Sequence, residues 1–502
     1  MRGRHAERAR QWSHPVSRTE SKIIALRPAA ADNGDAAGQT VSLYQKQQKI
    51  YPRAVHGWFA AWRWALVWLT QLVFYGLPWL QWNGRQAVLF DLAARRFYIF
   101  GLVLYPQDFI YLTALLVICA YALFLFTAVG GRLWCGYACP QTVYTEIYMW
   151  VERKIEGDRS ARMRLDQGPW TFQKLWRKTA KQVAWVAIGL WTGFTFVGYF
   201  TPIKTLGAEA LTLGLGPWEW FWILFYGLAT YGNAGYLREQ VCKYMCPYAR
   251  FQSAMFDRDT MIITYDATRG EPRGSRPRKA NPKQLGLGHC IDCSLCVQVC
   301  PTGIDIRNGL QYECIGCAAC IDVCNGVMDK MNYPRGLIRY STQNGMSHGW
   351  TRAQMFKRVL RPRVLVYTAI LAFIGAAFVG SLVLRSPFKV DVIRDRGALA
   401  RIVEDGYVEN VYRLQIMNAL EQPERYRIGV SGLEGLRLAS ESQVEVEPAA
   451  SRWVVVRVQL PPQHAEPLRG HTHPIEFRID RLPQGGQTEH RVLERSTFLV
   501  PR

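Results

Sequence analysis

The sequence predicts a multi-domain membrane protein that combines an α-helical transmembrane domain of about five spans, a cysteine-rich α+β domain and a C-terminal β-sandwich. Three observations support this fold class. Long apolar stretches alternate with basic loops, eight of the 13 cysteines lie between residues 290 and 324, and the last segment has a two-residue hydrophobic period. The expected parts are a basic tail (1–56), a four-span membrane domain (57–250), the cysteine-rich domain (251–362), a fifth span (363–384) and the β-sandwich (385–502).

Five stretches are long and apolar enough to cross a bilayer, which takes about 20 apolar residues. They are residues 57–79, 109–130, 182–201, 218–236 and 363–384. A sixth apolar stretch, 87–105, contains Asp91, Arg95 and Arg96. Because charged side chains near the middle of a span are costly, we expect this stretch to form an interfacial or re-entrant helix.

The formal net charge of +22 arises largely from loops between the apolar stretches. In a soluble protein this charge would suggest a nucleic-acid partner, but basic loops beside spans are typical of the cytoplasmic side of a membrane protein. The loops 132–181 and 238–361 are rich in Lys and Arg, whereas 201–218 contains only Lys204. We therefore expect a multi-pass protein of the bacterial cell inner membrane. Its N-terminus and cysteine-rich domain would be cytoplasmic, its last domain periplasmic, and its partner the lipid bilayer rather than nucleic acid.

Eight cysteines form two similar runs, C-I-D-C-S-L-C-V-Q-V-C-P from Cys290 and C-I-G-C-A-A-C-I-D-V-C from Cys314. Bacterial ferredoxins use this spacing to hold two [4Fe–4S] clusters, each with three thiolates from one run and the fourth from the other. A zinc site would space its ligands as pairs, and disulfides are disfavoured in the cytoplasm. The sequence thus predicts a ferredoxin-like domain with two [4Fe–4S] clusters. The expected ligand sets are Cys290, Cys293, Cys296 with Cys324, and Cys314, Cys317, Cys320 with Cys300.

The motif C-x-x-x-C-P occurs twice, with Cys135 and Cys139 after the second predicted span and with Cys242 and Cys246 after the fourth. The membrane domain therefore resembles two parallel repeats of one unit. If the motifs are helical, cysteines four residues apart lie on one face, and the four thiols could converge. Soft thiolates select Cu(I), zinc or iron–sulfur species, so these cysteines are the candidate catalytic and copper-binding residues. The alternatives are four cysteines that pack as small apolar side chains, or two disulfides.

The C-terminal segment has the pattern of a small antiparallel sandwich. Short alternating runs at 411–417, 453–460 and 475–479 are separated by Gly, Pro and Asn. Their number and length predict an immunoglobulin-like β-sandwich. The segment contains no cysteine, so it lacks the disulfide of antibody domains.

Together these motifs resemble those of a known family, the FixG/RdxA/CcoG accessory proteins of cbb3-type cytochrome c oxidase assembly. The resemblance rests on G-R-L-W-C-G-Y-A-C-P-Q-T-V-Y-T-E from Gly131, C-K-Y-M-C-P-Y-A-R-F-Q-S-A-M-F-D from Cys242, the two ferredoxin runs, and V-E-N-V-Y-R-L-Q-I-M-N from Val408. It covers the chain from about Tyr51 to the C-terminus and implies a cupric reductase that supplies Cu(I) to the oxidase. Electrons would pass from an unknown cytoplasmic donor through both clusters to copper, the substrate. The copper would be held at the C-x-x-x-C-P thiols, and the outer domain would dock oxidase subunits or a copper chaperone.

Two other functions fit the same motifs. In a quinol-linked membrane electron relay, the thiol pairs would shape a quinone or cofactor site and copper would play no part. In a non-enzymatic assembly scaffold, the β-sandwich would bind oxidase subunits and the clusters would sense redox state. A copper requirement for turnover would distinguish a cupric reductase from the electron relay. If the protein is a scaffold, deletion of residues 387–502 should abolish its function but leave any reductase activity in membranes.

Overall fold

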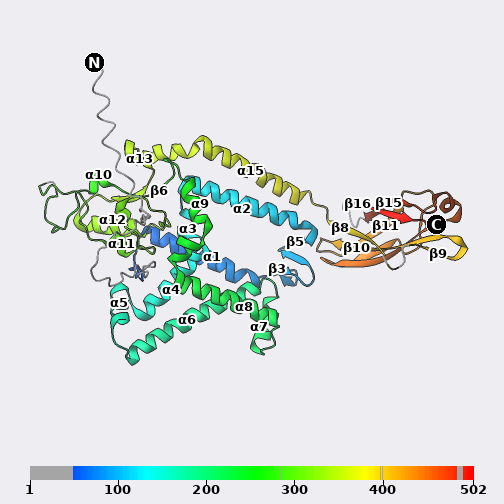
Figure 1. Cartoon of the computed structure of the whole chain (residues 1–502), viewed down its shortest axis with the longest axis horizontal. Helices are drawn as coiled ribbons and strands as arrows, with labels where there is room; N and C mark the ends of the chain where they lie inside the picture. Colours follow the sequence, from blue (N-terminus) through cyan, green and yellow to red (C-terminus); the bar gives the residue numbers. More distant parts are fainter. Residues whose placement is uncertain (1–48, 283, 396, 398–399, 483–489) are drawn as a thin grey trace, which may run out of the picture. The chain divides into compact units, whose positions relative to one another are not determined.

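Helices dominate the first half of the chain and strands the last quarter, in the order that the sequence predicts (Figure 1). The computed structural model describes residues 49–502 apart from 283, 396, 398–399 and 483–489. Most of the predicted basic tail, 1–56, therefore lies outside the described residues. The chain from Ile50 to Arg502 forms one unit, within which the helical part, the cysteine-rich part and the sandwich contact one another.

A long helix lies in each of the five predicted spans. These helices are α1 (Trp58–Gly76), α2 (Phe109–Gly130), α6 (Phe172–Val197), α8 (Pro217–Thr230) and α15 (Pro362–Val383). Among the described residues, two helical stretches have both the length and the hydropathy of a span, Pro106–Gly130 and Pro362–Val383. Membrane crossing by α1, α6 and α8 stays a prediction.

Helices α2 and α15 pack against each other and expose large apolar side chains (Figure 1). Phe109 and Ile110 on α2 and Phe373 and Val383 on α15 are between 66% and 77% exposed. A soluble monomer rarely exposes a continuous apolar surface of this kind. The helix pair is therefore suited to an apolar surrounding such as the interior of a bilayer.

Helices α6 and α8 approach closely because glycines line their contact. A Cβ atom on Gly193 would lie 2.2 Å from the carbonyl oxygen of Ile223, and one on Gly189 would lie 2.7 Å from that of Gly227. Beyond its end, α8 continues into a π-helical segment, η3 (Tyr231–Leu237). The remaining helices of this part are α3 (Leu133–Tyr137), α4 (Pro140–Glu156), α5 (Arg159–Gln167), α7 (Ile203–Leu211) and α9 (Pro247–Met255).

The prediction of an interfacial or re-entrant helix at 87–105 is wrong. The stretch forms a three-stranded antiparallel sheet of β3 (Val88–Asp91), β4 (Arg96–Ile99) and β5 (Leu102–Leu104). The chain reverses at Arg95 and Phe100, whose φ angles of 54° and 53° are left-handed. The first reversal places Asp91, Arg95 and Arg96 around one hairpin turn, where all three side chains are at least partly exposed. The charges that argued against a span therefore lie at a turn and not along a helix.

The β3–β5 sheet packs against the C-terminal domain. Tyr98 and Val103 of the sheet form an apolar cluster with Met417 and Ala449 of that domain. The hydroxyl of Tyr105 donates a hydrogen bond to the carbonyl of Asn418 at 2.8 Å. The segment mispredicted as a helix is thus a platform for the last domain.

Asp108 adds a buried ion cluster to this contact. Its side chain is 2% exposed and pairs with Arg385, at 2.8 Å, and with Lys389, both at the entry to the C-terminal domain. Arg385 also donates to the carbonyl of Val103 at 2.8 Å. The buried carboxylate therefore connects the end of β5, the start of α2 and the chain that follows α15.

The C-terminal domain is a β-sandwich, as predicted. One sheet has the order β12-β14-β10-β8 with β9 paired to β10, and the other has the order β13-β11-β15-β16. Tyr412, Leu414, Phe477 and Phe498 are 0% exposed in the core between the sheets. The strands are β8 (Phe388–Arg394), β9 (Arg401–Ile402), β10 (Val408–Asn418), β11 (Glu424–Ser431), β12 (Arg437–Leu438), β13 (Gln443–Val446), β14 (Ser451–Leu460), β15 (Thr472–Arg481) and β16 (Arg491–Leu499).

The cysteine-rich domain is small and mixed. A two-stranded antiparallel sheet pairs the chain before the first cysteine run with the chain after the second, and two helices follow the cysteine turns. Two further helices, α13 and α14, lead into α15. The elements are β6 (Ile262–Tyr265), α10 (Ala267–Gly270), α11 (Leu295–Gln298), α12 (Ala319–Met331), β7 (Ile338–Ser341), α13 (Gln343–His348) and α14 (Arg352–Lys357).

The substitution Asp108→Asn should loosen the C-terminal domain. It leaves the nearly buried Arg385 without its counter-charge, and breaking a buried pair in this way costs about 3–5 kcal/mol. We expect faster amide hydrogen exchange in β5 and β8 and a lower melting temperature. The control is Asp329→Asn, because the pair of Asp329 with Arg335 at 2.7 Å is exposed on both sides and such surface pairs contribute little to stability. Equal effects of the two changes would contradict the role assigned to Asp108.

Candidate functional site

Tight turns wrap the first cysteine run around one pocket. Asp292 and Ser294, which flank the second cysteine of the run, have left-handed φ angles of 51° and 52°. The second run repeats this pattern, with φ angles of 70° at Gly316 and 59° at Ala318. Four thiol residues line the first pocket, namely Cys290, Cys293, Cys296 and, from α12, Cys324.

The second set gathers in the same crossed manner. Cys300, at the end of the first run, lies within electrostatic range of Cys314, Cys317 and Cys320. Each pocket therefore receives three cysteines from one run and one from the other, as the spacing predicts. The assignment of these eight residues as cluster ligands stays a prediction, and their arrangement supports it.

Both pockets fit an iron–sulfur cluster by the chemistry of their donors. Burial raises the pKa of Cys314 and Cys324 to about 12, so these thiols are neutral at pH 7 until a metal displaces their protons. Among the described residues, no three His, Cys, Asp or Glu side chains converge tightly enough to hold a single metal ion. A [4Fe–4S] cluster takes four cysteines without such tight convergence, because each thiolate binds a different iron.

The two C-x-x-x-C-P motifs share one local structure. A short helical segment carries the first cysteine, the helix breaks, and the second cysteine caps a new helix that begins with the proline. Cys135 lies in α3 and Cys139 caps α4, while Cys242 lies in the π-helical segment η4 (Val241–Met245) and Cys246 caps α9. The break means that the thiols of a pair do not share one face of a continuous helix. The two motifs share this local structure, and the repetition of a whole membrane unit stays a prediction.

The four C-x-x-x-C-P thiols nevertheless lie near one another. Cys139 is within electrostatic range of Cys135, Cys242 and Cys246. Burial, and then the neighbouring thiols, raises the pKa of Cys135 to about 12 and that of Cys242 to about 11, while the guanidinium of Arg132 acts in the opposite direction. The four thiols therefore form one group of soft donors, although no three of them converge tightly enough in the described residues to hold a single metal ion.

Gln252 completes the wall beside Cys135. Its side chain is 0% exposed, and its Oε1 lies 3.5 Å from the Cys135 Sγ, which donates a weak hydrogen bond. The same side chain also interacts with the hydroxyl of Tyr248. Cys135 therefore has a buried polar neighbour that accepts from its neutral thiol.

The first C-x-x-x-C-P motif touches the second cluster run through backbone. A Cβ atom on Gly136 would lie 2.8 Å from the carbonyl group of Gly316 and 2.9 Å from the amide nitrogen of Cys317. No side chain larger than that of glycine fits in this space. Cys135 and Cys242 also pack against the apolar cluster that contains Cys317. The second cluster site and the C-x-x-x-C-P site are therefore adjacent.

Helix α1 docks on the same run. The carboxylate of Asp322 in α12 accepts hydrogen bonds from the backbone N–H groups of Phe59, at 3.3 Å, and Ala60, at 2.8 Å. An acidic side chain at this position caps the first turn of α1. One turn later, the guanidinium of Arg63 donates to the carbonyl of Cys317 at 3.0 Å and is 6% exposed.

Buried arginines lie beside both cysteine sets. At the second set, Arg63 donates to the carbonyl of Cys317, and Glu146 and Asp322 lie within electrostatic range of its guanidinium. At the first set, Arg276 donates to the carbonyl of Cys290 at 3.4 Å, and Arg307 pairs with Asp305 and Asp292. The two sites therefore differ in their hydrogen bonds and neighbours, but each combines buried arginines with carboxylates.

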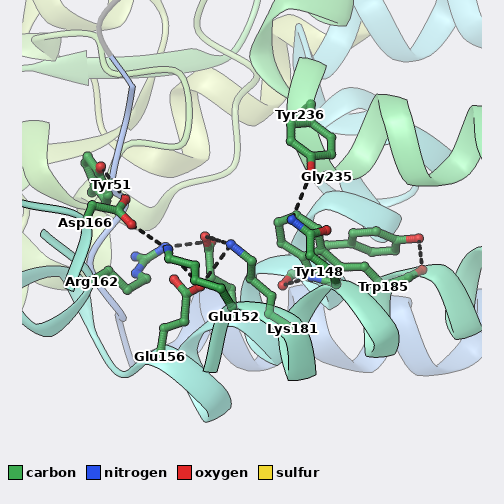
Figure 2. A network of polar contacts seen from close by, with 12 residues as sticks. Tyr51, Tyr148, Glu152, Glu156, Arg162, Asp166, Lys181, Trp185, Gly235 and Tyr236 are labelled. Carbon is green, nitrogen blue, oxygen red and sulfur yellow. Dashed lines mark hydrogen bonds and ion pairs between the residues drawn. The ribbon is translucent and has the colours of Figure 1, made fainter. Parts of the chain in front are cut away.

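A buried ion network holds α4 behind the first motif (Figure 2). Glu152 pairs with Arg162 of α5, at 2.8 Å, and with Arg238 after η3, at 3.0 Å. Glu156 pairs with Lys181 of α6 at 2.9 Å. Burial alone would raise the pKa of Glu152, but these cations hold it below its usual range. The network fixes α4, and with it Cys139 at its first turn, relative to α5, α6 and η3.

Some of these residues were missed in the sequence. Arg63 is a lone charge inside a predicted span, which is a recognised sign of a functional residue and could have identified it. Gln252 and Asp322 carry no local signal, because their partners lie more than a hundred residues away. Only the folded chain brings them to the site.

Comparison with known proteins gives matches over most of the chain. Residues 237–343 match the family described as a 4Fe-4S dicluster domain, residues 112–157 a 4Fe-4S binding domain, and residues 378–501 the IG-like fold at the C-terminal of FixG. The chain is 39% identical to protein RdxA of Cereibacter sphaeroides over 457 residues, which are 88% of this chain and 96% of that protein. It is also 39% identical to the nitrogen fixation protein FixG of Rhizobium meliloti over 470 residues, 88% and 89% of the two chains. A crystal structure of a FixG-related protein from Vibrio parahaemolyticus aligns with a TM-score of 0.19 and 21% identity, covering 24% of this chain and 99% of that one.

Cys324 and Cys300 each contribute the fourth ligand to the set of the other run, so replacing one or the other should remove different clusters. We expect Cys324→Ala to eliminate the same cluster signal as Cys290→Ala, and Cys300→Ala the same signal as Cys314→Ala. The different hydrogen bonds and neighbours of the two sites should give the clusters distinct reduction potentials, so a redox titration followed by electron paramagnetic resonance can tell them apart. If Cys324→Ala instead removed the signal lost in Cys314→Ala, the crossed ligand sets would be wrong.

Proposed function

The chain belongs to the family of FixG, RdxA and RdxB, and from this membership we propose that it is a membrane iron–sulfur oxidoreductase that reduces Cu(II) to Cu(I). The Cu(I) would serve assembly of the copper centre of a cbb3-type cytochrome c oxidase. The observation that carries the proposal is the backbone contact of the first C-x-x-x-C-P motif with the second ferredoxin run at Gly136 and Gly316. An electron on the cluster that the second cysteine run would hold is then next to the four thiols of the C-x-x-x-C-P motifs.

The chemistry of the site suits this step. When bound, the two [4Fe–4S] clusters supply one-electron transfer, and each Cu(II) ion takes up one electron to become Cu(I). Thiolates of Cys135, Cys139, Cys242 and Cys246 stabilise Cu(I) in preference to Cu(II), which makes the reduction more favourable. Binding a copper ion releases thiol protons, and the thiol of Cys135 donates a weak hydrogen bond to the Oε1 of Gln252.

The position of the second set favours one direction of flow. This set meets the first C-x-x-x-C-P motif through backbone, where Gly136 lies against Gly316 and Cys317. An electron from a cytoplasmic donor would therefore move from the first set to the second and on to copper.

The interdomain contacts support the proposed topology. The β3–β5 sheet follows α1, the sandwich follows α15, and the two pack together, so they lie on the same side of any membrane. An even number of crossings must separate them, as α2, α6, α8 and α15 provide. The ferredoxin-like domain contacts the opposite end of α1. With the basic loops in the cytoplasm, the sandwich would be periplasmic, where oxidase subunits or a copper chaperone could dock.

Removing one thiol from each motif should abolish copper reduction and spare the clusters. We expect Cys135→Ala with Cys246→Ala to keep the full iron content and cluster absorbance but to lose Cu(I) formation. The assay is anaerobic: the reduced protein receives stoichiometric Cu(II), and cluster oxidation is followed together with a Cu(I)-specific chelator.

The control for this double variant is Cys119→Ala, since Cys119 is an exposed thiol on α2 outside both motifs. Unchanged copper turnover in the double variant would refute the thiol site. Loss of one cluster's worth of iron would instead mean that these thiols hold a third cluster. Clusters that stay reduced with copper but are oxidised by a quinone would favour the electron relay.

The contact at Gly136 should control the rate of the final electron step. Gly136→Ala places a methyl group 2.8 Å from the backbone of Gly316 and must push α3 away from the second run. We expect slower cluster oxidation by Cu(II) with unchanged iron content. Gly326→Ala is the matched control, because a Cβ atom there meets nothing within 4 Å and alanine favours the helix by about 0.5–1 kcal/mol. Equal rates for the two variants would show that the contact does not limit transfer.

A further inference from the structure

A groove runs between α1, α4 and α6, and no cysteine lines it. It has a volume of about 1100 Å³ and a mostly apolar lining. Trp68 is 60% exposed in it and Trp191 47% exposed. Large apolar side chains left open in this way indicate a partner of apolar character. The tryptophans that line the groove are Trp64, Trp68, Trp150 and Trp191.

One end of the groove is basic. His56, Arg153 and Lys154 line it there, where α4 ends and the chain enters α1. No ion pair involves any of the three among the residues that the structure describes. The ammonium group of Lys154 lies 5.9 Å from the ring centre of Trp150, so it sits at the edge between the charged end and the apolar wall.

Two acids of α4 are committed to another side of the helix. Figure 2 shows Glu152 and Glu156 turned toward Arg162 and Lys181. The third acid of α4, Glu146, lies outside the groove, in a smaller adjoining pocket that Arg153 also lines. No acidic side chain is among the described residues that line the groove itself.

We propose that this groove binds one anionic phospholipid, with the phosphate at Arg153 and Lys154 and an acyl chain along the tryptophans of α1. The apolar wall of α1 extends from Trp64 to Gly76, which is about 18 Å at 1.5 Å per residue. This length is close to one leaflet of a hydrocarbon core about 30 Å thick. Basic pockets between helices at the cytoplasmic surface suit acidic head groups. A zwitterionic lipid has the same phosphate but no net charge and would therefore bind the two cations more weakly, and an isoprenoid quinone would leave both without a counter-charge.

This inference rests on the proposed membrane topology, which places the basic end at the cytoplasmic surface. It does not rest on copper reduction, because no C-x-x-x-C-P cysteine lines the groove. The two can therefore fail separately. A reporter fused after Arg502 tests the topology by itself: activity confined to the cytoplasm would remove the premise.

The test is native mass spectrometry of the full chain in detergent, titrated with phosphatidylglycerol or with phosphatidylcholine of the same acyl chains. We expect one phosphatidylglycerol to bind preferentially. The substitutions Arg153→Gln and Lys154→Gln together should weaken its binding by about tenfold or more, because each basic group near a membrane surface adds to the attraction of acidic lipid. Phosphatidylcholine binding should not change.

Two further variants separate charge from folding. Arg153→Lys with Lys154→Arg keeps both charges and should retain the lipid. Arg352→Gln with Lys357→Gln removes two exposed cations of α14, outside the groove, and should leave binding unchanged. Cluster absorbance in each variant reports intact folding. Equal binding of the two lipids, an unaffected Arg153/Lys154 double variant, or a quinone recovered in stoichiometric amount from the purified protein would each overturn the proposal.

Discussion

The arrangement of the protein depends on one contact without side chains, that between Gly136 and the backbone of Gly316 and Cys317. A methyl group on Gly136 would lie under 3 Å from three backbone atoms. Because both partners are main chain, neither can move aside as a flexible side chain could. The contact holds the C-x-x-x-C-P thiols beside the second cysteine set, and the proposed transfer of an electron to copper requires this proximity.

Several interactions around this contact hold it in place. Asp322 caps the first turn of α1 from inside the cysteine-rich domain, and Arg63 of the same helix binds the carbonyl of Cys317. The network of Glu152 and Glu156 fixes α4 from the other side (Figure 2). Removing one partner from such a buried network leaves uncompensated charge, which is strongly destabilising. The network thus ties the position of the thiols to the packing of three helices.

A second contact region joins the opposite end of the helices to the β-sandwich. The β3–β5 sheet supplies Tyr98 and Val103 to a shared apolar cluster, and Asp108 binds two cations at the start of the sandwich. The helical part is therefore contacted at one end by the cysteine-rich domain and at the other by the sandwich. In the proposed topology these ends face opposite sides of the membrane. The exposed apolar surfaces of α2 and α15, and the groove with the basic end, lie between them.

The features that could be predicted from the sequence are those encoded by residues close together in the chain. The cysteine spacings predicted two crossed sets of four, the two-residue period predicted the sandwich, and long apolar runs predicted the five long helices. Each of these signals is local, because ligand turns, strands and helices are set by residues a few positions apart. The same reasoning failed at 87–105, where an apolar run interrupted by charges led us to predict a helix. Left-handed turns at Arg95 and Phe100 instead fold this stretch into a sheet. The folded chain alone shows that Gly136 meets Gly316, that Arg63 binds the carbonyl of Cys317, and that Gln252 lies beside Cys135. Such contacts join segments separated by more than fifty residues, and no local pattern encodes which of many buried glycines, arginines or glutamines will meet.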